Sequence, residues 1–151
     1  MKRLSVIIVT YNSENDIYDC ISSIKQWSDI PFDELELIIV DNNSRNTDYM
    51  FEQLLSLYGS DIVLIKNTRN GGYGQGNNMG IRKATAPVVL IMNPDVRLIE
   101  PVFKTALDAF EENKALSIYG MKQMLSATEQ SNNSFSCAYT VNGYLQTFLT
   151  S

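Results

Sequence analysis

Four short runs of apolar, mostly β-branched residues constrain the fold of this chain more than any other feature. They occupy residues 4–9, 35–40, 62–65 and 88–92, and polar residues hardly interrupt them. Each run is too short for a typical helix, whereas the strands of a parallel sheet that helices cover on both faces have this composition. The runs therefore predict four strands, buried on both faces, of a mostly parallel sheet.

Segments with helical spacing of apolar residues lie between these runs. Residues 50–58 follow Thr47 with this spacing, and Gly59 stands where a helix would stop. Ser13 and Asp16 are placed as a capping pair before the first such segment. Its apolar residues are Ile17, Cys20, Ile21, Ile24 and Trp27. A helix between two strands predicts a βαβ unit, so the chain is expected to be an α/β protein.

The last third of the chain has weaker patterns. Pro101 precedes the amphipathic residues 102–110, which predict a helix, and residues 116–119 are expected to form a strand. Residues 126–136 are rich in Ser, Asn, Thr and Gln and predict a loop, and residues 135–141 alternate loosely as a strand would. Because no linker or internal repeat divides the 151 residues, a single domain is expected.

Composition excludes several classes of function. The 12 Lys and Arg residues are outnumbered by 17 Asp and Glu, so the chain lacks the basic face that nucleic acid requires. Without histidine, Ser/His and Cys/His nucleophile pairs are excluded. Cys20 and Cys137 do not form a metal-binding or disulfide pattern and are expected to be reduced thiols of a cytosolic protein. No run of 18 apolar residues occurs, so no transmembrane segment is predicted.

Each apolar run ends in a cluster of polar residues. These clusters occupy residues 10–12, 41–44, 67–72 and 93–95. In an open parallel sheet the carboxyl ends of the strands share one edge, and ligands bind in the crevice outside it. Turn formation alone could explain one such cluster. Four clusters at a common edge favour a binding site.

The third cluster continues into a glycine-rich segment, residues 70–81, that is typical of a loop turning into a helix. Its five glycines would each destabilise a helix by about 1 kcal/mol, so another factor must favour them. Close approach of a ligand to the backbone is the functional explanation, and a flexible loop is the structural one. A dinucleotide-binding motif is excluded because Asn77 and Met79 stand where a third glycine is required, and the Gly-Lys-Ser/Thr of a phosphate-binding P-loop is absent.

Four segments, in this order and spacing, carry a specific resemblance. They read VIIVTYN at 6–12, LIIVDNNS at 37–44, NGGYGQGNNMGI at 70–81 and LIMNPDV at 90–96. Together they resemble the family 2 glycosyltransferases of the GT-A fold, and the likeness is closest to the rhamnosyltransferase-like bacterial branch, whose members often have Asn-Pro-Asp in place of Asp-x-Asp.

The resemblance implies a three-layer α/β/α fold with a mostly parallel sheet. On this expectation residues 1–151 form one GT-A-type domain. Residues 1–120 would be its nucleotide-sugar-binding core, and residues 121–151 would be an incomplete acceptor-side region of a chain truncated at its C-terminus.

The resemblance also implies roles for particular residues. Thr10 and Tyr11 would lie under the nucleobase and ribose, Asp41 would accept a hydrogen bond from a ring N–H of the base, and residues 71–77 would close over the nucleotide. A carboxylate is a natural acceptor for the imide N–H of uracil or thymine. The predicted substrate-binding residues are Thr10, Tyr11, Asn12, Asp41, Asn43, Asn70, Gly71, Gly72, Asn77 and Asn93.

A divalent metal, Mg²⁺ or Mn²⁺, is the implied cofactor. Asp95 would bind it between the two phosphates, with Asn93 near the ribose or the water shell of the metal. These ions prefer oxygen ligands and would neutralise charge on the departing nucleoside diphosphate. Asn93 replaces the first acid of Asp-x-Asp, which predicts weaker metal binding. Asn46 and Asn77 also depart from the family, whose members usually have Asp and often have Arg at these positions.

The leading hypothesis is a glycosyltransferase that moves a hexosyl or deoxyhexosyl group from a UDP-, dTDP- or GDP-sugar to a glycan or lipid-linked acceptor, with inversion and metal assistance. The resemblance implies a role in cell-wall or polysaccharide biosynthesis, in the cytoplasm or at the inner face of the membrane. No catalytic base is nominated, because the acidic residues after Asp95 are expected to be solvated; they are Glu100, Asp108, Glu111, Glu112 and Glu129.

The alternative hypothesis is a non-catalytic fragment or module that binds a nucleoside diphosphate and lacks the general base. A third hypothesis, a doubly wound receiver or flavin-binding domain, is disfavoured because receiver domains have acidic residues where this chain has Thr10, Tyr11 and Asn12.

Overall fold

The computed structural model describes residues 1–122 and 124 in full, and the backbone of residues 138–141 and 144–147. The chain consists of two compact units, residues 1–107 and residues 108–151. The prediction of a single domain with a core of residues 1–120 stays a prediction. No helix in the described part of the chain is long and apolar enough to cross a lipid bilayer.

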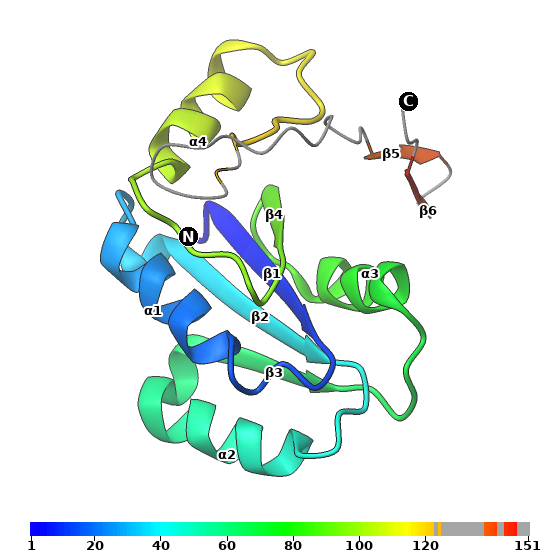
Figure 1. Cartoon of the computed structure of the whole chain (residues 1–151). Coiled ribbons are helices and arrows are strands. Elements are labelled where there is room, and N and C mark those ends of the chain that lie inside the picture. The colour runs from blue at the N-terminus through cyan, green and yellow to red at the C-terminus, as the bar shows by residue number, and fades with distance from the viewer. Residues whose placement is uncertain (123, 125–137, 142–143, 148–151) are drawn as a thin grey trace. The chain divides into compact units, whose positions relative to one another are not determined.

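The first unit is built on a parallel sheet of four strands (Figure 1). The strands are β1 (Leu4–Thr10), β2 (Leu35–Asp41), β3 (Ile62–Lys66) and β4 (Val88–Met92), in the order β3-β2-β1-β4. All four predicted strands are confirmed. The prediction that every strand is buried on both faces is wrong for β3 and β4, which are largely half-exposed and lie at the two edges of the sheet that the described residues form.

Three helices cover this sheet, with α1 (Ile17–Trp27) and α2 (Thr47–Tyr58) on one side and α3 (Tyr73–Lys83) on the other (Figure 1). The predicted helical spacing is confirmed in α1, whose buried residues are Ile17, Cys20, Ile21, Ser23 and Ile24. Gly59 ends α2 with a positive φ of 57° and donates its backbone N–H to Leu55. This conformation favours glycine, so the predicted stop is confirmed.

The predicted capping pair of Ser13 and Asp16 is wrong. The side chain of Asp16 makes no capping hydrogen bond to α1. The backbone carbonyl of Ser13 instead accepts hydrogen bonds from the N–H groups of Asp16 and Ile17, both at 3.1 Å. Because the backbone satisfies these groups, the Asp16 carboxylate is free to face a different part of the molecule.

Helix α3 forms through the glycine-rich segment because two of its glycines allow close packing on β1. A Cβ atom on Gly76 would lie 2.6 Å from Cγ1 of Val9, and one on Gly80 would lie 2.5 Å from Cγ2 of Ile7. Any side chain larger than a hydrogen atom at these two positions would displace residues of the core. These two glycines therefore serve helix–sheet packing rather than ligand approach, which corrects the functional explanation for them.

In the second unit, the predicted strand at residues 116–119 is not formed. These residues are mostly exposed and have no regular structure, because no strand in the described part of the chain pairs with them. An antiparallel pair, β5 (Ala138–Val141) and β6 (Tyr144–Thr147), includes the end of the predicted strand at 135–141. The predicted loop at 126–136 and Cys137 lie outside the described residues.

The helix predicted after Pro101 is confirmed as α4 (Phe103–Glu112). Within the first unit, Phe103, Ala106 and Leu107 are its buried residues. The carboxylate of Asp29 accepts hydrogen bonds at 3.1 Å from the backbone N–H groups of Phe103 and Lys104 and so satisfies the N-terminus of the helix.

Packing of α3 on β1 gives a test by paired substitution. Gly80→Ala is expected to lower the free energy of unfolding by about 1–3 kcal/mol, because the added methyl group overpacks the core at Ile7. Gly74→Ala is the control, since its Cβ would meet no atom within 4 Å, and alanine should raise helix stability by up to about 1 kcal/mol. Urea denaturation measures both; equal effects of the two variants would contradict the packing argument.

Candidate functional site

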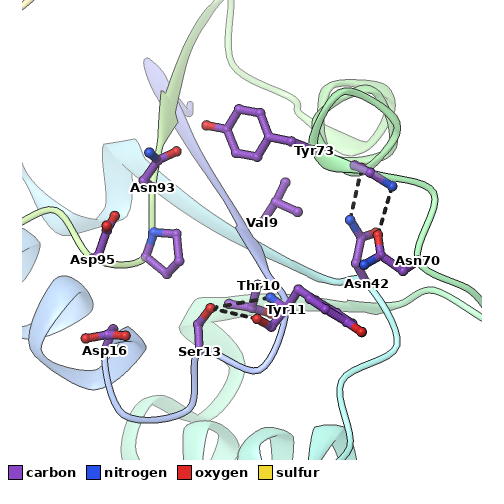
Figure 2. A pocket seen from close by; sticks show the side chains of 12 residues that line it. Val9, Thr10, Tyr11, Ser13, Asp16, Asn42, Asn70, Tyr73, Asn93 and Asp95 are labelled. Carbon is purple, nitrogen blue, oxygen red and sulfur yellow. Dashed lines mark hydrogen bonds between the residues drawn. The ribbon is translucent and has the colours of Figure 1, made fainter. Parts of the chain in front are cut away.

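A pocket of about 460 Å³ lies at the carboxyl ends of β1 and β4 (Figure 2). The chain leaves β1 towards β2 on one side, and later returns from β3 to β4 on the other side. In an open parallel sheet the crevice at such a reversal of strand order is the usual place for a ligand. The lining residues are Val9, Thr10, Tyr11, Ser13, Asp16, Asn42, Asn70, Gly72, Tyr73, Asn93, Pro94 and Asp95. All four polar clusters of the sequence contribute to this list.

The structure brings six of the predicted site residues together in this pocket and leaves five outside its lining. Those that line it are Thr10, Tyr11, Asn70, Gly72, Asn93 and Asp95. Those that do not are Asn12, Asp41, Asn43, Gly71 and Asn77. The two groups differ in function within the fold, since several of the second group build the loops that support the first.

Asp41 is fully buried, and its carboxylate organises the loop after β2. One oxygen accepts hydrogen bonds from the hydroxyl groups of Thr10 (2.9 Å) and Ser44 (2.5 Å). The other accepts from the backbone N–H of Ser44 (2.9 Å) and the hydroxyl of Thr47 (2.5 Å). Four bonds fill the acceptor capacity of a carboxylate. Contact with a nucleobase would require one of them to be exchanged, so that role stays a prediction.

Asn12 and Asn43 have backbone conformations that suit tight loops. Their φ angles are 51° and 64°, a region that asparagine tolerates better than most residues. The backbone N–H of Asn12 donates to the hydroxyl of Ser44 (2.8 Å), and its side-chain oxygen accepts from the N–H of Arg45 (3.1 Å). Asn12 therefore joins the loops that follow β1 and β2.

The side chain of Asn42, a residue absent from the predicted set, connects the second polar cluster, residues 41–44, to the third, residues 67–72. Its side-chain nitrogen donates to the carbonyl of Gly72 (3.0 Å), and its side-chain oxygen accepts from the amide of Asn67 (3.2 Å). Gly72 has a φ of 84° and donates its N–H to the side chain of Asn70 (2.9 Å), as Figure 2 shows. These bonds fix the N-terminal end of α3 against the end of β2.

Two half-exposed tyrosines stand on different walls of the pocket, with Val9 between them (Figure 2). Tyr11 is 52% exposed and Tyr73 is 47% exposed. Burial is the main cause that raises the pKa of the Tyr73 phenol above its ordinary value, so the phenol stays protonated at neutral pH. Partly exposed aromatic faces offer contact area for a flat, rigid ligand group such as a nucleobase.

Asn77 lies one helical turn after Tyr73 and is fully buried. Its side-chain nitrogen and oxygen have no hydrogen-bond partner among the described residues. The Asn77 amide lowers the pKa of the Tyr73 phenol, an effect smaller than that of burial, although no hydrogen bond joins the two side chains. An unsatisfied buried amide is costly, typically by about 1–3 kcal/mol.

Asp95 and Asp16 are the two carboxylates in the pocket lining (Figure 2). Asp95 is exposed and follows Asn93, which is also exposed, in a turn closed by a hydrogen bond from Val96 N–H to the Asn93 carbonyl (3.2 Å). The described residues contain no group of three or more His, Cys, Asp or Glu side chains that could hold a metal ion. Asp95 and Asn93 fit a metal of the kind that takes one or two protein oxygens and completes its shell with phosphates and water.

The thiol of Cys20 is placed as a hydrogen-bond donor rather than as a nucleophile. Burial raises its pKa to about 12, so it stays protonated at neutral pH. Its sulfur lies 3.6 Å from the carbonyl oxygen of Asn93 and donates to it. A thiolate mechanism is therefore excluded for this residue.

Sequence reasoning missed half of the lining: Val9, Ser13, Asp16, Asn42, Tyr73 and Pro94. Asn42 and Pro94 lie inside polar clusters that the sequence did identify. The glycines dominate the pattern around Tyr73, and the spacing of Asp16 from Ser13 is that of a helix cap, so neither residue is indicated as part of a pocket. An aromatic residue within a glycine-rich segment was the signal available for Tyr73.

Comparison with known proteins identifies the family. The sequence profile of Glycosyl transferase family 2 matches residues 5–136. The chain belongs to this family. That result confirms the resemblance drawn from the four sequence segments at the level of the family.

Two curated relatives are transferases. The chain is 37% identical over 99 residues to the low-salt glycan biosynthesis hexosyltransferase Agl10 of Haloferax volcanii, and the match covers 63% of this chain and 28% of Agl10. It is 30% identical over 116 residues to the poly(ribitol-phosphate) β-N-acetylglucosaminyltransferase TarS of Staphylococcus aureus, covering 75% of this chain and 20% of TarS. The chain thus spans less than a third of the length of either relative.

Solved structures confirm the GT-A fold. The chain superimposes on the structure of S. aureus TarS residues 1–349 with UDP-GlcNAc with a TM-score of 0.67 and 23% sequence identity. The match covers 90% of this chain and 39% of the TarS chain. The mannosyltransferase PcManGT of Pyrobaculum calidifontis, solved with GDP-Man and Mn²⁺, has a TM-score of 0.61 and 28% identity, and covers 72% of this chain and 31% of that chain.

The buried carboxylate of Asp41 gives a test of how the site is supported. Asp41→Asn is expected to lower the free energy of unfolding by about 2–4 kcal/mol, because its NH₂ group would face donors that now bond to a charged acceptor. Asp48→Asn, on α2, is the control, since its exposed pair with Lys66 contributes at most about 1 kcal/mol. Denaturant unfolding measures both, and a cost at Asp41 no larger than at Asp48 would contradict the supporting role.

Proposed function

We propose that the pocket between β1 and β4 binds the nucleoside diphosphate of a sugar donor, and that this chain supplies the donor half of a glycosyltransferase. The observation that carries the proposal is the convergence of aromatic, amide and carboxylate side chains from four strand ends in one pocket. The family of the chain and the ligands in the structures of TarS and PcManGT support it.

The nucleoside is proposed to lie on the wall formed by Thr10 and Tyr11. Tyr11 is exposed enough to pack against a base, and the hydroxyl of Thr10 is held by Asp41. Asp41 would accept a hydrogen bond from a ring N–H of the base only after losing one of the four hydrogen bonds that it now accepts. Asn70 and Gly72 line the pocket on the side of α3, where they would contact the nucleotide.

The diphosphate is proposed to lie between the N-terminus of α3 and Asp95. Gly72 precedes the first residue of α3, and free backbone N–H groups at a helix N-terminus favour a phosphate. Asp95, with Asn93, would hold a divalent metal on the opposite side. Such a metal, when bound, stabilises the negative charge that develops on the departing diphosphate. With a single carboxylate, affinity for the metal is expected to depend on the nucleotide.

We further propose that the transferred group is hexosyl or deoxyhexosyl, and that transfer inverts the configuration at the anomeric carbon. The rhamnosyltransferase-like branch, a glycan or lipid-linked acceptor, and a role in surface polysaccharide assembly in the cytoplasm follow from the same family reasoning. Each concerns the whole enzyme, whereas this chain matches a minority of each relative's length.

A second candidate is a module that binds the donor and transfers nothing. It is favoured by the absence of an available base among the described lining residues, since Asp95 is proposed for the metal and Asp16 lies near Arg97. Glycosyl transfer or donor hydrolysis by this chain, abolished in Asp95→Ala, would exclude this candidate.

Calorimetric titration tests nucleotide binding. UDP, dTDP and GDP are each titrated with Mn²⁺, with Mg²⁺ and in excess chelator, and at least one is expected to bind more tightly with metal. Asp95→Asn should weaken binding about tenfold or more in Mn²⁺ and leave binding in chelator unchanged, because only the metal contact is lost. Asp48→Asn, outside the pocket, should bind as the unaltered chain does. No binding of any nucleotide at millimolar concentration would contradict the proposal.

A further inference from the structure

The segment of residues 93–98, which carries Asp95, has no helix or strand to hold it. Within the segment, one hydrogen bond between backbone groups is formed, from the Val96 N–H to the carbonyl of Asn93. Asp95 is nevertheless the residue on which proposed metal binding depends. What fixes the segment therefore determines where that carboxylate stands.

One face of α1 and the residue preceding it contact this segment. The residues concerned are Asp16, Asp19, Cys20 and Ser23. Spacings of three and four residues among them place their side chains on one face of the helix. The Cys20 thiol donates to the carbonyl of Asn93. The hydroxyl of Ser23 accepts a hydrogen bond from the N–H of Leu98 at 3.0 Å. These two contacts hold the beginning and the end of the segment.

Arg97 provides the contacts in the middle. Its Nη1 donates to the carbonyl oxygens of Pro94 (3.1 Å) and Val96 (3.2 Å), on either side of Asp95. Its Nη2 lies 3.5 Å from the carboxylate of Asp19 and 3.9 Å from that of Asp16. One guanidinium thus connects the backbone around Asp95 to the start of α1. The planar fork of arginine can serve both directions, which the single ammonium of lysine cannot do with the same geometry.

Two simpler explanations fit the geometry less well. Arg97 does not line the pocket, and both of its terminal nitrogens face protein oxygens, so it is not placed to bind a phosphate itself. As a purely stabilising ion pair it would contribute little, because its side chain is 30% exposed and its carboxylate partners are 50% and 76% exposed. The distinctive property of Arg97 is that its carbonyl contacts flank the proposed metal ligand.

We propose that Arg97 is a positioning residue for Asp95: it ties the turn at residues 93–96 to the acidic start of α1, and so sets the metal affinity of the site. The part of this inference that concerns metal rests on the proposed function, whereas the part that concerns the turn does not. Substitution of a group that orients a metal ligand without touching the metal typically lowers metal affinity about 10–100-fold.

The test compares Arg97→Gln with Arg82→Gln, the same substitution at an exposed arginine of α3 outside the pocket. Amide hydrogen exchange of Val96 is measured first, without nucleotide or metal. In Arg97→Gln this exchange is expected to be about tenfold faster, because the turn opens more often, while Arg82→Gln leaves it unchanged. Arg97→Lys, which keeps the charge and loses the fork, is expected to resemble Arg97→Gln.

Mn²⁺ is then titrated against each variant at a saturating concentration of UDP, or of dTDP or GDP if one of these binds the unaltered chain more tightly. The Mn²⁺ dissociation constant is expected to rise about tenfold in Arg97→Gln, with nucleotide binding in chelator unchanged and little change in melting temperature. Unchanged exchange at Val96 would overturn the positioning role. Faster exchange with unchanged Mn²⁺ affinity would overturn its link to the metal. A failure of the unaltered chain to bind any of UDP, dTDP and GDP with Mn²⁺ would instead count against the proposed function, and the Val96 exchange would still decide the positioning role.

Discussion

Strand β1 lies between β2 and β4, and this position determines where the pocket forms. Pairing on both sides buries the strand along its whole length, and its register sets Thr10 beside Asp41 and Ile8 beside Met92. The residues that follow each strand consequently meet at one edge. A pocket opens there because the chain leaves β1 in one direction and approaches β4 from the other.

The polar residues at this edge of the sheet have two different functions. Buried groups, chiefly the Asp41 carboxylate and the Asn42 amide, satisfy backbone and hydroxyl groups and hold the loops in place. Exposed groups, such as Tyr11 and Asp95, face the pocket and are available to a ligand. Arg97 is partly exposed, but its inferred role is also to support a loop, because it bonds to the backbone around Asp95. A pocket built on fixed loops does not need to order them at the moment of binding, which favours affinity.

Much of the fold could be predicted from the sequence, because short β-branched runs and helical spacing are local signals. The four strands, the helices after Ser13, Thr47 and Pro101, and the stop at Gly59 follow from such signals. The role of Gly76 and Gly80 could not be predicted, since it depends on which strand α3 approaches. The strand expected at residues 116–119 failed for a related reason, because a strand requires a neighbour that no local pattern specifies.

The candidate site was predicted in outline but not in detail. Clustering of polar residues after each strand located the edge, yet it did not separate Asp41, which is buried, from Asp95, which is exposed. Burial is a property of the assembled loops and is not encoded in residue type. For the same reason Asp16 was assigned to a helix cap, while the structure turns its side chain towards the pocket and Arg97.

A nucleoside diphosphate and its metal are proposed to bind together at the carboxyl ends of β1 and β4. The most direct measurement is the broadening of backbone amide signals in nuclear magnetic resonance spectra when substoichiometric Mn²⁺ is added in the presence of UDP. If the metal binds at Asp95, the signals of Asn93, Asp95 and Val96 should be lost first, followed by those of Tyr11 and Tyr73. Without UDP this selectivity should be absent. Broadening centred on another acidic region, such as the outer face of α2, would contradict it.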